Sequence, residues 1–549
     1  MSRFPARMLI FGLLFCFLAL LGAGQQAAPD YVLFNGKIFT SDSAHPYVEA
    51  LAIRGERIVA ANESVKVQAL AGPQTRRVDL GGRTAIPGLN DAHMHLELQP
   101  ASSVFLSFKS RNPSWAEVKD AIAGAVQKSP KGTIISGEIL FAVYFDTTIN
   151  REALDQVAPD HPVILKTVTG HAAILNSAAL AKFGIRDDQR DPLGGRYERA
   201  ANGRLTGVLR EYAAMQMDRT QANLTSDTDA LQQFRDYFAR ASQFGITSIQ
   251  DMSNAMPPDR CVALLEKTPT PIRVRVMRMT MTTPAGRDTE EGRSTSRNPS
   301  PLITVSGTKW MLDGTPLEGT LNPREAQRAL FASDPNLTVT QLALTFSAKE
   351  IEAMLRESLE NNDQLMVHVS GYPSASAMLE AMQATGGEKV WTGRRVRFEH
   401  GDGLFPDLIP RAKQFGVVVV QNPTHFAAGL KLAQAQPLRS LLADGIPVAL
   451  GSDGPMNPFL NIMLASTHPN RPSEAMSREQ AVIAYTLTSA YAEFTEKDKG
   501  SLEAGKLADL TVLSQDIFSV PLQELPKTES ILTMVGGKIV YDAKLLSAH

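Results

Sequence analysis

Two histidines stand one residue apart near the start of the chain, in the stretch TAIPGLNDAHMHLE. Successive side chains of a β-strand point to opposite faces, so His93 and His95 would project to the same side. Two imidazoles on one face can supply half of the ligands of a metal site. Because short patterns of this kind also occur by chance at surface turns, the rest of the chain has to support the interpretation.

Further residues of metal-binding type stand at the ends of four later apolar runs. These are Lys309 in ITVSGTKWMLDG, His368 in QLMVHVSG, His400 in RVRFEHGD and Asp453 in IPVALGSDGP. Active sites of parallel β/α barrels lie at the carboxyl ends of the strands, which is where this order would place the side chains. The repeated placement along the chain is much harder to obtain by chance than the paired histidines alone.

Each of these residue types has a chemical reason to be present. Neutral imidazoles and a carboxylate suit a borderline divalent cation such as zinc, and four histidines with one aspartate could hold one or two ions. A lysine ammonium would repel a cation, but burial lowers a lysine's pKa, and the free amine can add CO2 to become a carbamate. Carboxylated Lys309 would bridge two ions. The alternative is an ordinary structural lysine paired with Asp313.

Other polar residues compete for roles at this site. Lys166, in PVILKTVTGH, precedes FGITSIQDM, which we expect to be the third strand, so this lysine comes too early for a bridge from the fourth strand. Glu211, in GVLREYA, is a weaker candidate for the bridge. We interpret His171, Asn176 and His425 as substrate contacts, with hydrogen-bonded structural residues as the alternative for each.

Strand and helix patterns alternate through the middle of the chain. LTFSAKEIEAMLRESLENND precedes QLMVHVSG, and PSASAMLEAMQATGG precedes RVRFEHGD. Repeated βα units over about 400 residues favour an α/β fold of the (β/α)8 TIM-barrel type over a doubly wound sheet. We expect the barrel at residues 88–499, with an insertion at about 110–240.

Both ends of the mature chain have the pattern of β-structure. Runs such as YVLFNGKIFT and ADLTVLSQD are short, rich in β-branched and aromatic residues, and bounded by turn residues. We expect residues 25–87 and 500–549 to form one small composite β-sandwich built from both termini.

The first residues have the pattern of an export signal. Arg3 and Arg7 precede the apolar run MLIFGLLFCFLALL, and small residues follow it. The run is shorter than the ~18 residues typical of a membrane-spanning helix. We therefore expect residues 1–24 to be a signal peptide and the protein to be periplasmic or secreted, without a stable membrane anchor. Cleavage would remove Cys16 and leave Cys261 alone, so no internal disulfide is expected.

Composition and charge exclude several classes of partner. The 549 residues are 43% hydrophobic and 20% charged, with a formal net charge of -2, which is an ordinary globular balance. Because like charges form no block, neither nucleic acid nor an anionic membrane surface is an expected partner. We expect a small-molecule substrate, and a homo-oligomer is compatible with this composition.

The ordered motifs resemble the amidohydrolase superfamily, within the amidohydrolase-3 or YtcJ-like branch that includes N-substituted formamide deformylases. The resemblance rests on IPGLNDAHMH, GHAAILNSAAL, FGITSIQDM, GTKWMLDGT, VHVSG, RFEH, QNPTH, GSDGP and GSLEAGKLADLTVL. It implies a metal-dependent barrel whose metal shell is His93, His95, carboxylated Lys309, His368, His400 and Asp453. GEILFAVYFDTT and VSGYPSA depart from the branch pattern, so the substrate pocket is expected to differ.

These observations predict a metal-dependent hydrolase that cleaves a non-peptide carbon–nitrogen bond in an amide, N-formyl or cyclic amide substrate. Asp453 would take a proton from the attacking water and deliver it to the leaving amine. His171 or His368 would donate a hydrogen bond to the oxyanion. The nearest alternatives are an esterase, lactonase or phosphoesterase that uses the same site. A non-catalytic secreted binding protein is disfavoured, because no ligand position is vacant.

Overall fold

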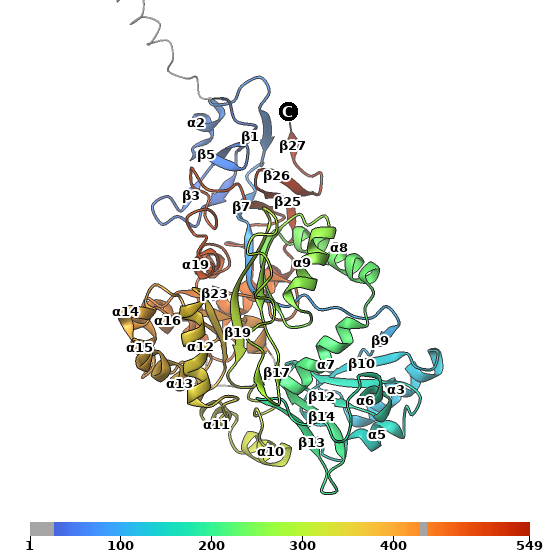
Figure 1. Cartoon of the computed structure of the whole chain (residues 1–549). Helices are drawn as coiled ribbons and strands as arrows, with labels where there is room; N and C mark the ends of the chain where they lie inside the picture. The colour runs from blue at the N-terminus through green and yellow to red at the C-terminus, as the bar shows by residue number, and fades with distance from the viewer. Residues whose placement is uncertain (1–26, 428–435, 549) are drawn as a thin grey trace, which may run out of the picture.

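An eight-stranded parallel sheet forms the centre of the computed structural model, which describes residues 27–427 and 436–548 (Figure 1). Its strands, in hydrogen-bonded order, are β8 (Leu89–Met94), β15 (Ile246–Ser253), β16 (Arg273–Arg278), β19 (Ile303–Met311), β20 (Leu365–Val369), β21 (Arg397–His400), β22 (Val418–Gln421) and β23 (Val448–Leu450). The pairings are parallel throughout. The predicted (β/α)8 TIM barrel is confirmed.

The first and last strands of this sheet come together at a seam. The Asp453 nitrogen donates to the His93 carbonyl at 2.9 Å, and the Ser452 nitrogen donates to Asp91 Oδ1 at 2.8 Å. A Cβ on Gly451 would lie 2.5 Å from the His93 nitrogen. Glycine is therefore needed for this close approach, and the seam brings Asp453 beside the paired histidines.

Helices cover the outside of the barrel (Figure 1). They include α8 (Asp227–Gln243), α9 (Pro258–Lys267), α12 (Ala348–Glu360), α13 (Tyr372–Ala384), α15 (Ile409–Gln414), α16 (Leu438–Ala443) and α17 (Pro458–Thr467). Helix α12 shows the local cause: Ser347 and Glu350 form a capping box at its start. Its buried Ile351, Met354 and Leu355 have helical spacing, so one face packs on the barrel.

A second sheet interrupts the barrel between β8 and β15, at the lower right of Figure 1. Its strands are β9 (Ser103–Phe105), β10 (Ile134–Ile139), β11 (Val163–Thr167), β12 (Ala172–Leu175), β13 (Gly195–Arg199) and β14 (Leu205–Glu211), followed by α7 (Tyr212–Asn223). The strands before FGITSIQDM therefore belong to the insertion. That stretch forms β15, the second strand of the barrel, so our expectation of a third strand was wrong.

Strands from both ends of the chain form two further sheets. One contains β1 (Tyr31–Phe34), β4 (Ala50–Arg54), β5 (Arg57–Asn62), β6 (Arg76–Asp79) and β27 (Ser547–Ala548). The other contains β2 (Lys37–Phe39), β3 (Tyr47–Val48), β7 (Thr84–Pro87), β24 (Leu510–Leu513), β25 (Ser530–Val535) and β26 (Lys538–Asp542). Both sheets contribute to one buried apolar cluster. The sandwich as a separate domain, with its limits, stays a prediction.

The predicted signal peptide, residues 1–24, lies outside the described residues. Within the part of the chain that the structure describes, none of the helices combines the length and apolar character needed to cross a membrane. Cys261 is buried and carries a free thiol.

Candidate metal centre

Three side chains meet at the carboxyl ends of barrel strands from both sides of the seam. His93, His400 and Asp453 each offer a ligand atom, and these atoms lie within 4.8 Å of one another. Asp453 Oδ2 is 3.6 Å from His93 Nε2 and 3.8 Å from His400 Nε2. His95 joins them, with its Nε2 3.5 Å from Asp453 Oδ1. The strand ends thus collect a compact set of nitrogen and oxygen donors.

His400 and Asp453 reach this set through unusual backbone conformations. Their φ angles are 68° and 35°, in the left-handed region that non-glycine residues rarely adopt. Neighbouring residues of an extended strand face opposite sides, and Glu399 faces His93, so an extended His400 would point out of the barrel. Instead, its ring centroid lies 5.0 Å from that of His93. Such conformations cost about 1–3 kcal/mol each and cluster at functional sites. The fold therefore maintains strain here that aims both side chains inward.

Further histidines extend the group on two sides. The His368 ring centroid is 4.5 Å from that of His400, and the His171 ring centroid is 4.8 Å from that of His368. His171 follows β11, so the insertion contributes directly to the cluster. On the other side lies His425, in the short helix η1 (Pro423–Ala427), with its Nε2 3.6 Å from Asp453 Oδ2.

Buried acceptors hold three of the barrel histidines through Nδ1. The pairs are His93 with Glu399 Oε2 at 2.8 Å, His368 with Asp313 Oδ1 at 2.7 Å and His95 with the Met252 carbonyl at 2.8 Å. A proton on Nδ1 leaves the lone pair of Nε2 free for a cation, which is a common arrangement behind metal ligands. Sequence reasoning missed the part played by Glu399, although RFEH places it next to His400.

The charge states of these side chains suit metal binding. Burial lowers the pKa of His93 to about 4 and holds those of His368 and His400 well below the usual value. Burial alone would raise the pKa of Asp453, but the surrounding histidines hold it well below its usual range. Neutral imidazoles and an ionised carboxylate are the forms that coordinate cations. The residues therefore fit a divalent metal.

The model of the amidohydrolase family matches residues 76–541, which include every one of these side chains. The chain belongs to the amidohydrolase family. This finding confirms the resemblance inferred from the motifs, and it supports a metal-dependent hydrolase.

Several relatives are similar to this amidohydrolase over nearly the whole chain. The N-substituted formamide deformylase of Arthrobacter pascens is 25% identical, covering 93% of this chain and 98% of the relative. The putative amidohydrolase YtcJ of Bacillus subtilis is 26% identical, covering 90% and 95%. The protein LONG AFTER FAR-RED 3 of Arabidopsis thaliana is also 26% identical, covering 93% and 91%.

Solved structures share the fold of this amidohydrolase. An uncharacterized metal-dependent hydrolase from Pyrococcus furiosus has a TM-score of 0.62 at 20% identity, covering 89% of this chain and all of the other. The atrazine chlorohydrolase TrzN from Arthrobacter aurescens, complexed with zinc, has a TM-score of 0.53 at 15% identity, covering 93% and 95%. At these identities the likeness is one of fold.

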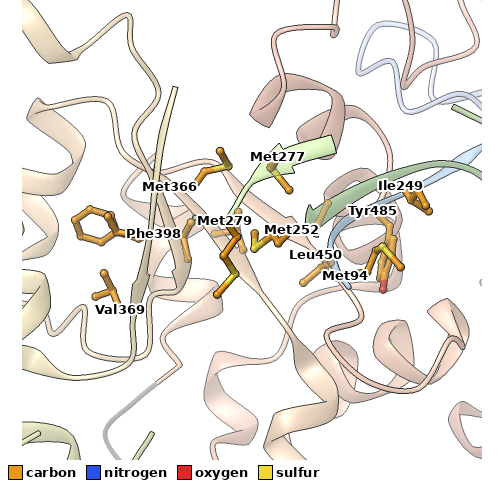
Figure 2. Close-up of a cluster of buried hydrophobic side chains, with 14 of the residues drawn as sticks. Met94, Ile249, Met252, Met277, Met279, Met366, Val369, Phe398, Leu450 and Tyr485 are labelled. Carbon is orange, nitrogen blue, oxygen red and sulfur yellow. The ribbon is translucent and has the colours of Figure 1, made fainter. Parts of the chain in front are cut away.

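Lys309 lies buried on β19 beside the cluster. Its Nζ is 3.0 Å from Met252 Sδ, and Met366 is its register partner on β20. Figure 2 shows both methionines among the buried side chains of neighbouring strands, with Met277, the register partner of Met252. Thioethers stabilise an ammonium poorly, and burial lowers the pKa of Lys309 to about 8.

The alternative partner proposed for Lys309 is occupied elsewhere. The Asp313 carboxylate accepts hydrogen bonds from His368, from the backbone nitrogens of Ser370 and Gly371, and from the Ser374 hydroxyl. It therefore serves as an anchor for His368.

Two residues considered from the sequence have their side chains bonded to other residues of the insertion. The Asn176 amide caps α6 (Ser177–Lys182), accepting from the Ala179 and Val163 nitrogens and donating to the Ala158 and His161 carbonyls. These four hydrogen bonds use its full capacity, so its amide acts as a structural cap and has none left for the predicted substrate contact. Lys166 lies on β11, with its Nζ 2.9 Å from Asp218 Oδ1.

Glu399→Gln is expected to weaken metal retention or activity by about 10- to 100-fold, as is typical of partners behind metal ligands. Arg397 donates to Glu399 at 2.7 Å, and with His93 it lowers the pKa of this buried carboxyl to about 2. The neutral amide would remove the charge that makes His93 a stronger ligand. Metal content after dialysis measures the effect. The matched control is Glu496→Gln, which removes the partner of Arg395 at 2.8 Å. Equal retention in both variants would contradict the role of Glu399.

Proposed function

We propose that this amidohydrolase binds zinc and hydrolyses a non-peptide carbon–nitrogen bond in an amide, N-formyl or cyclic amide substrate. The observation that carries the proposal is the set of His93, His400 and Asp453 ligand atoms within 4.8 Å, with the buried Glu399 carboxylate behind His93. The similarity to an N-substituted formamide deformylase over almost all of both chains supports an N-formyl amine as the first substrate class to test.

In this proposal two ions would share the compact set together with His95 and His368. His93, His95 and Asp453 would hold one, and His368 and His400 the other. When bound, such an ion lowers the pKa of water toward ~7 and polarises a carbonyl oxygen.

Lys309 would connect the two halves of the site as a carbamate. Its neutral amine would form a nitrogen–carbon bond to CO2 and lose one proton to solvent. The product is an anionic oxygen donor in place of an amine that would repel a metal ion when protonated. The burial of Lys309 supports this step, because burial lowers the pKa of its amine to about 8, and a thioether lies 3.0 Å from its Nζ.

Asp453 moves the proton in the proposed reaction. Its ionised carboxylate accepts a proton as the water oxygen bonds to the carbonyl carbon. It then delivers that proton to the nitrogen as the carbon–nitrogen bond breaks, leaving a carboxylic acid and an amine. Proton transfer by a positioned group contributes ~100- to 10,000-fold to such reactions.

His171 and His425 contact the substrate in this proposal. Burial alone would lower the pKa of His171, but the Glu211 carboxylate raises it to about 9. The imidazolium would donate from Nε2 to the carbonyl oxygen as negative charge develops there. His425, whose side chain is 41% exposed, lies at the outer edge of the cluster and would meet the leaving group.

A substrate panel tests the proposal: N-butylformamide, N-butylacetamide, a cyclic amide, a lactone and a phosphoester, each with zinc-loaded protein. We expect N-butylformamide to give butylamine and formate, with activity lost on chelation and restored by zinc. If the lactone or the phosphoester is turned over faster than the amides, the protein is a lactonase or a phosphoesterase, and the assignment to carbon–nitrogen bonds is wrong. Protein purified without any bound metal and without turnover would favour a binding function.

A further inference from the structure

The insertion supports His171 through Glu211. His171 Nδ1 lies 2.7 Å from Glu211 Oε2, and the Glu211 nitrogen donates to the His171 carbonyl at 2.8 Å. Glu211 is 0% exposed and stands where β14 ends and α7 begins. Both the side chain and the backbone of this glutamate therefore fix the same histidine.

The backbone and packing of Glu211 are specialised for this contact. Its φ is 50°, in the left-handed region, although it is not a glycine. Its second oxygen, Oε1, is buried without a hydrogen-bond partner among the residues that the structure describes. A Cβ on Gly314 would lie 2.2 Å from that oxygen, so the carboxylate fits only because residue 314 lacks a side chain. Strain and a bare, desolvated oxygen both cost stability, and the fold retains them.

The barrel supplies a parallel arrangement beside this one. Asp313, which precedes Gly314, accepts from His368 Nδ1 at 2.7 Å, and the rings of His368 and His171 are 4.8 Å apart. Two neighbouring histidines are thus each held through Nδ1 by a buried carboxylate, which leaves Nε2 of each ring free of that contact. One carboxylate comes from the barrel and the other from the insertion.

We infer that Glu211 is a positioning residue that holds the Nδ1 proton of His171 and fixes the orientation of its ring, so that Nε2 of His171 faces the active site. The inference rests on the proposed function for the role of His171, but the hydrogen bond itself does not. It also makes the insertion part of the catalytic apparatus, since the barrel alone would lack this donor.

The hydrogen bond is tested in metal-free protein by proton NMR with 15N-labelled histidine. A proton held between an imidazole nitrogen and a buried carboxylate resonates far downfield. We expect one such Nδ1 resonance that disappears in both His171→Asn and Glu211→Gln. Persistence of this resonance in folded Glu211→Gln protein, or its absence from the wild type, would overturn the inference. This measurement requires no substrate, so it tests the hydrogen bond between Glu211 and His171 even if no compound of the panel is hydrolysed.

The catalytic effect is tested by kinetics on N-butylformamide. Glu211→Gln is expected to lower kcat by about 10- to 100-fold with a smaller change in KM, and to keep its metal content. The same substitution in a His171→Asn background is expected to have little further effect, because Glu211 acts through His171. Additive losses in the double variant would assign Glu211 a separate structural role.

Two further variants separate positioning from general damage. Glu211→Asp keeps the charge and is expected to recover part of kcat, and it replaces Glu211→Gln in the test if the latter does not fold. Asp155→Asn removes another carboxylate of the insertion, which bonds Ser177 at 2.8 Å, and is expected to leave kcat unchanged. A loss in Asp155→Asn equal to that in Glu211→Gln would overturn the positioning role.

Discussion

Replacement of Asp453 by asparagine is expected to lower kcat by about 100- to 10,000-fold while the protein keeps its metal. Asparagine has nearly the same shape and retains one oxygen that can bind a metal ion. This oxygen would stand beside His93 and His95, whose Nε2 atoms lie 3.6 and 3.5 Å from the carboxylate. It cannot accept and return a proton at neutral pH. The expected result is therefore a loss of turnover that exceeds any loss of metal.

The experiment compares kcat on N-butylformamide with zinc content measured on the same sample. Asp509→Asn is the matched control, because Asp509 is also a buried carboxylate but pairs with Arg273 at 2.8 Å, at the amino end of β16. We expect this control to retain wild-type turnover. Full activity in Asp453→Asn would refute the assigned proton transfer, and loss of zinc in that variant would make Asp453 primarily a ligand.

The barrel and the order of its polar strand ends could be predicted because both follow from local patterns. Apolar runs alternating with amphipathic helices specify parallel strands, and parallel strands bring their carboxyl ends together wherever they stand in the sequence. His93 and Asp453 could therefore be expected at one place, although 359 positions separate them, and their ligand atoms lie 3.6 Å apart.

The partners behind the histidines could not be predicted in this way. His93 and Glu399 are 306 positions apart, and their hydrogen bond depends on which inward face each side chain takes in the closed barrel. No local pattern signals the left-handed φ of 68° that turns His400 inward. The insertion also led to a miscount of the barrel strands before FGITSIQDM, because the sheet of the insertion has the same local patterns as the barrel. For the same reason, the Asn176 side chain looked available for substrate when it caps a helix.

Replacement of Lys309 by methionine is expected to lower activity by more than the 10- to 100-fold typical of partners behind a metal site, because the carbamate would be a ligand itself. The substitution suits the apolar environment of Met252 and Met366, so the protein should fold and lose metal instead of stability. Metal content and kcat, measured together with thermal unfolding, check both parts.

Lys166→Met is the matched control for this substitution, since Lys166 is also a lysine on a strand and pairs with Asp218 at 2.9 Å in the insertion. It is expected to keep its metal and most of its activity. Wild-type protein depleted of CO2 should lose activity and regain it when bicarbonate is added, whereas Lys309→Met should not respond to bicarbonate. If Lys309→Met keeps wild-type turnover, or if removing CO2 has no effect on the wild type, the carbamate is excluded and Lys309 is a structural lysine. If Lys309→Met loses metal and activity, and the wild type depends on CO2, the anionic bridge is what allows a cluster of neutral imidazoles, with one carboxylate, to hold two ions.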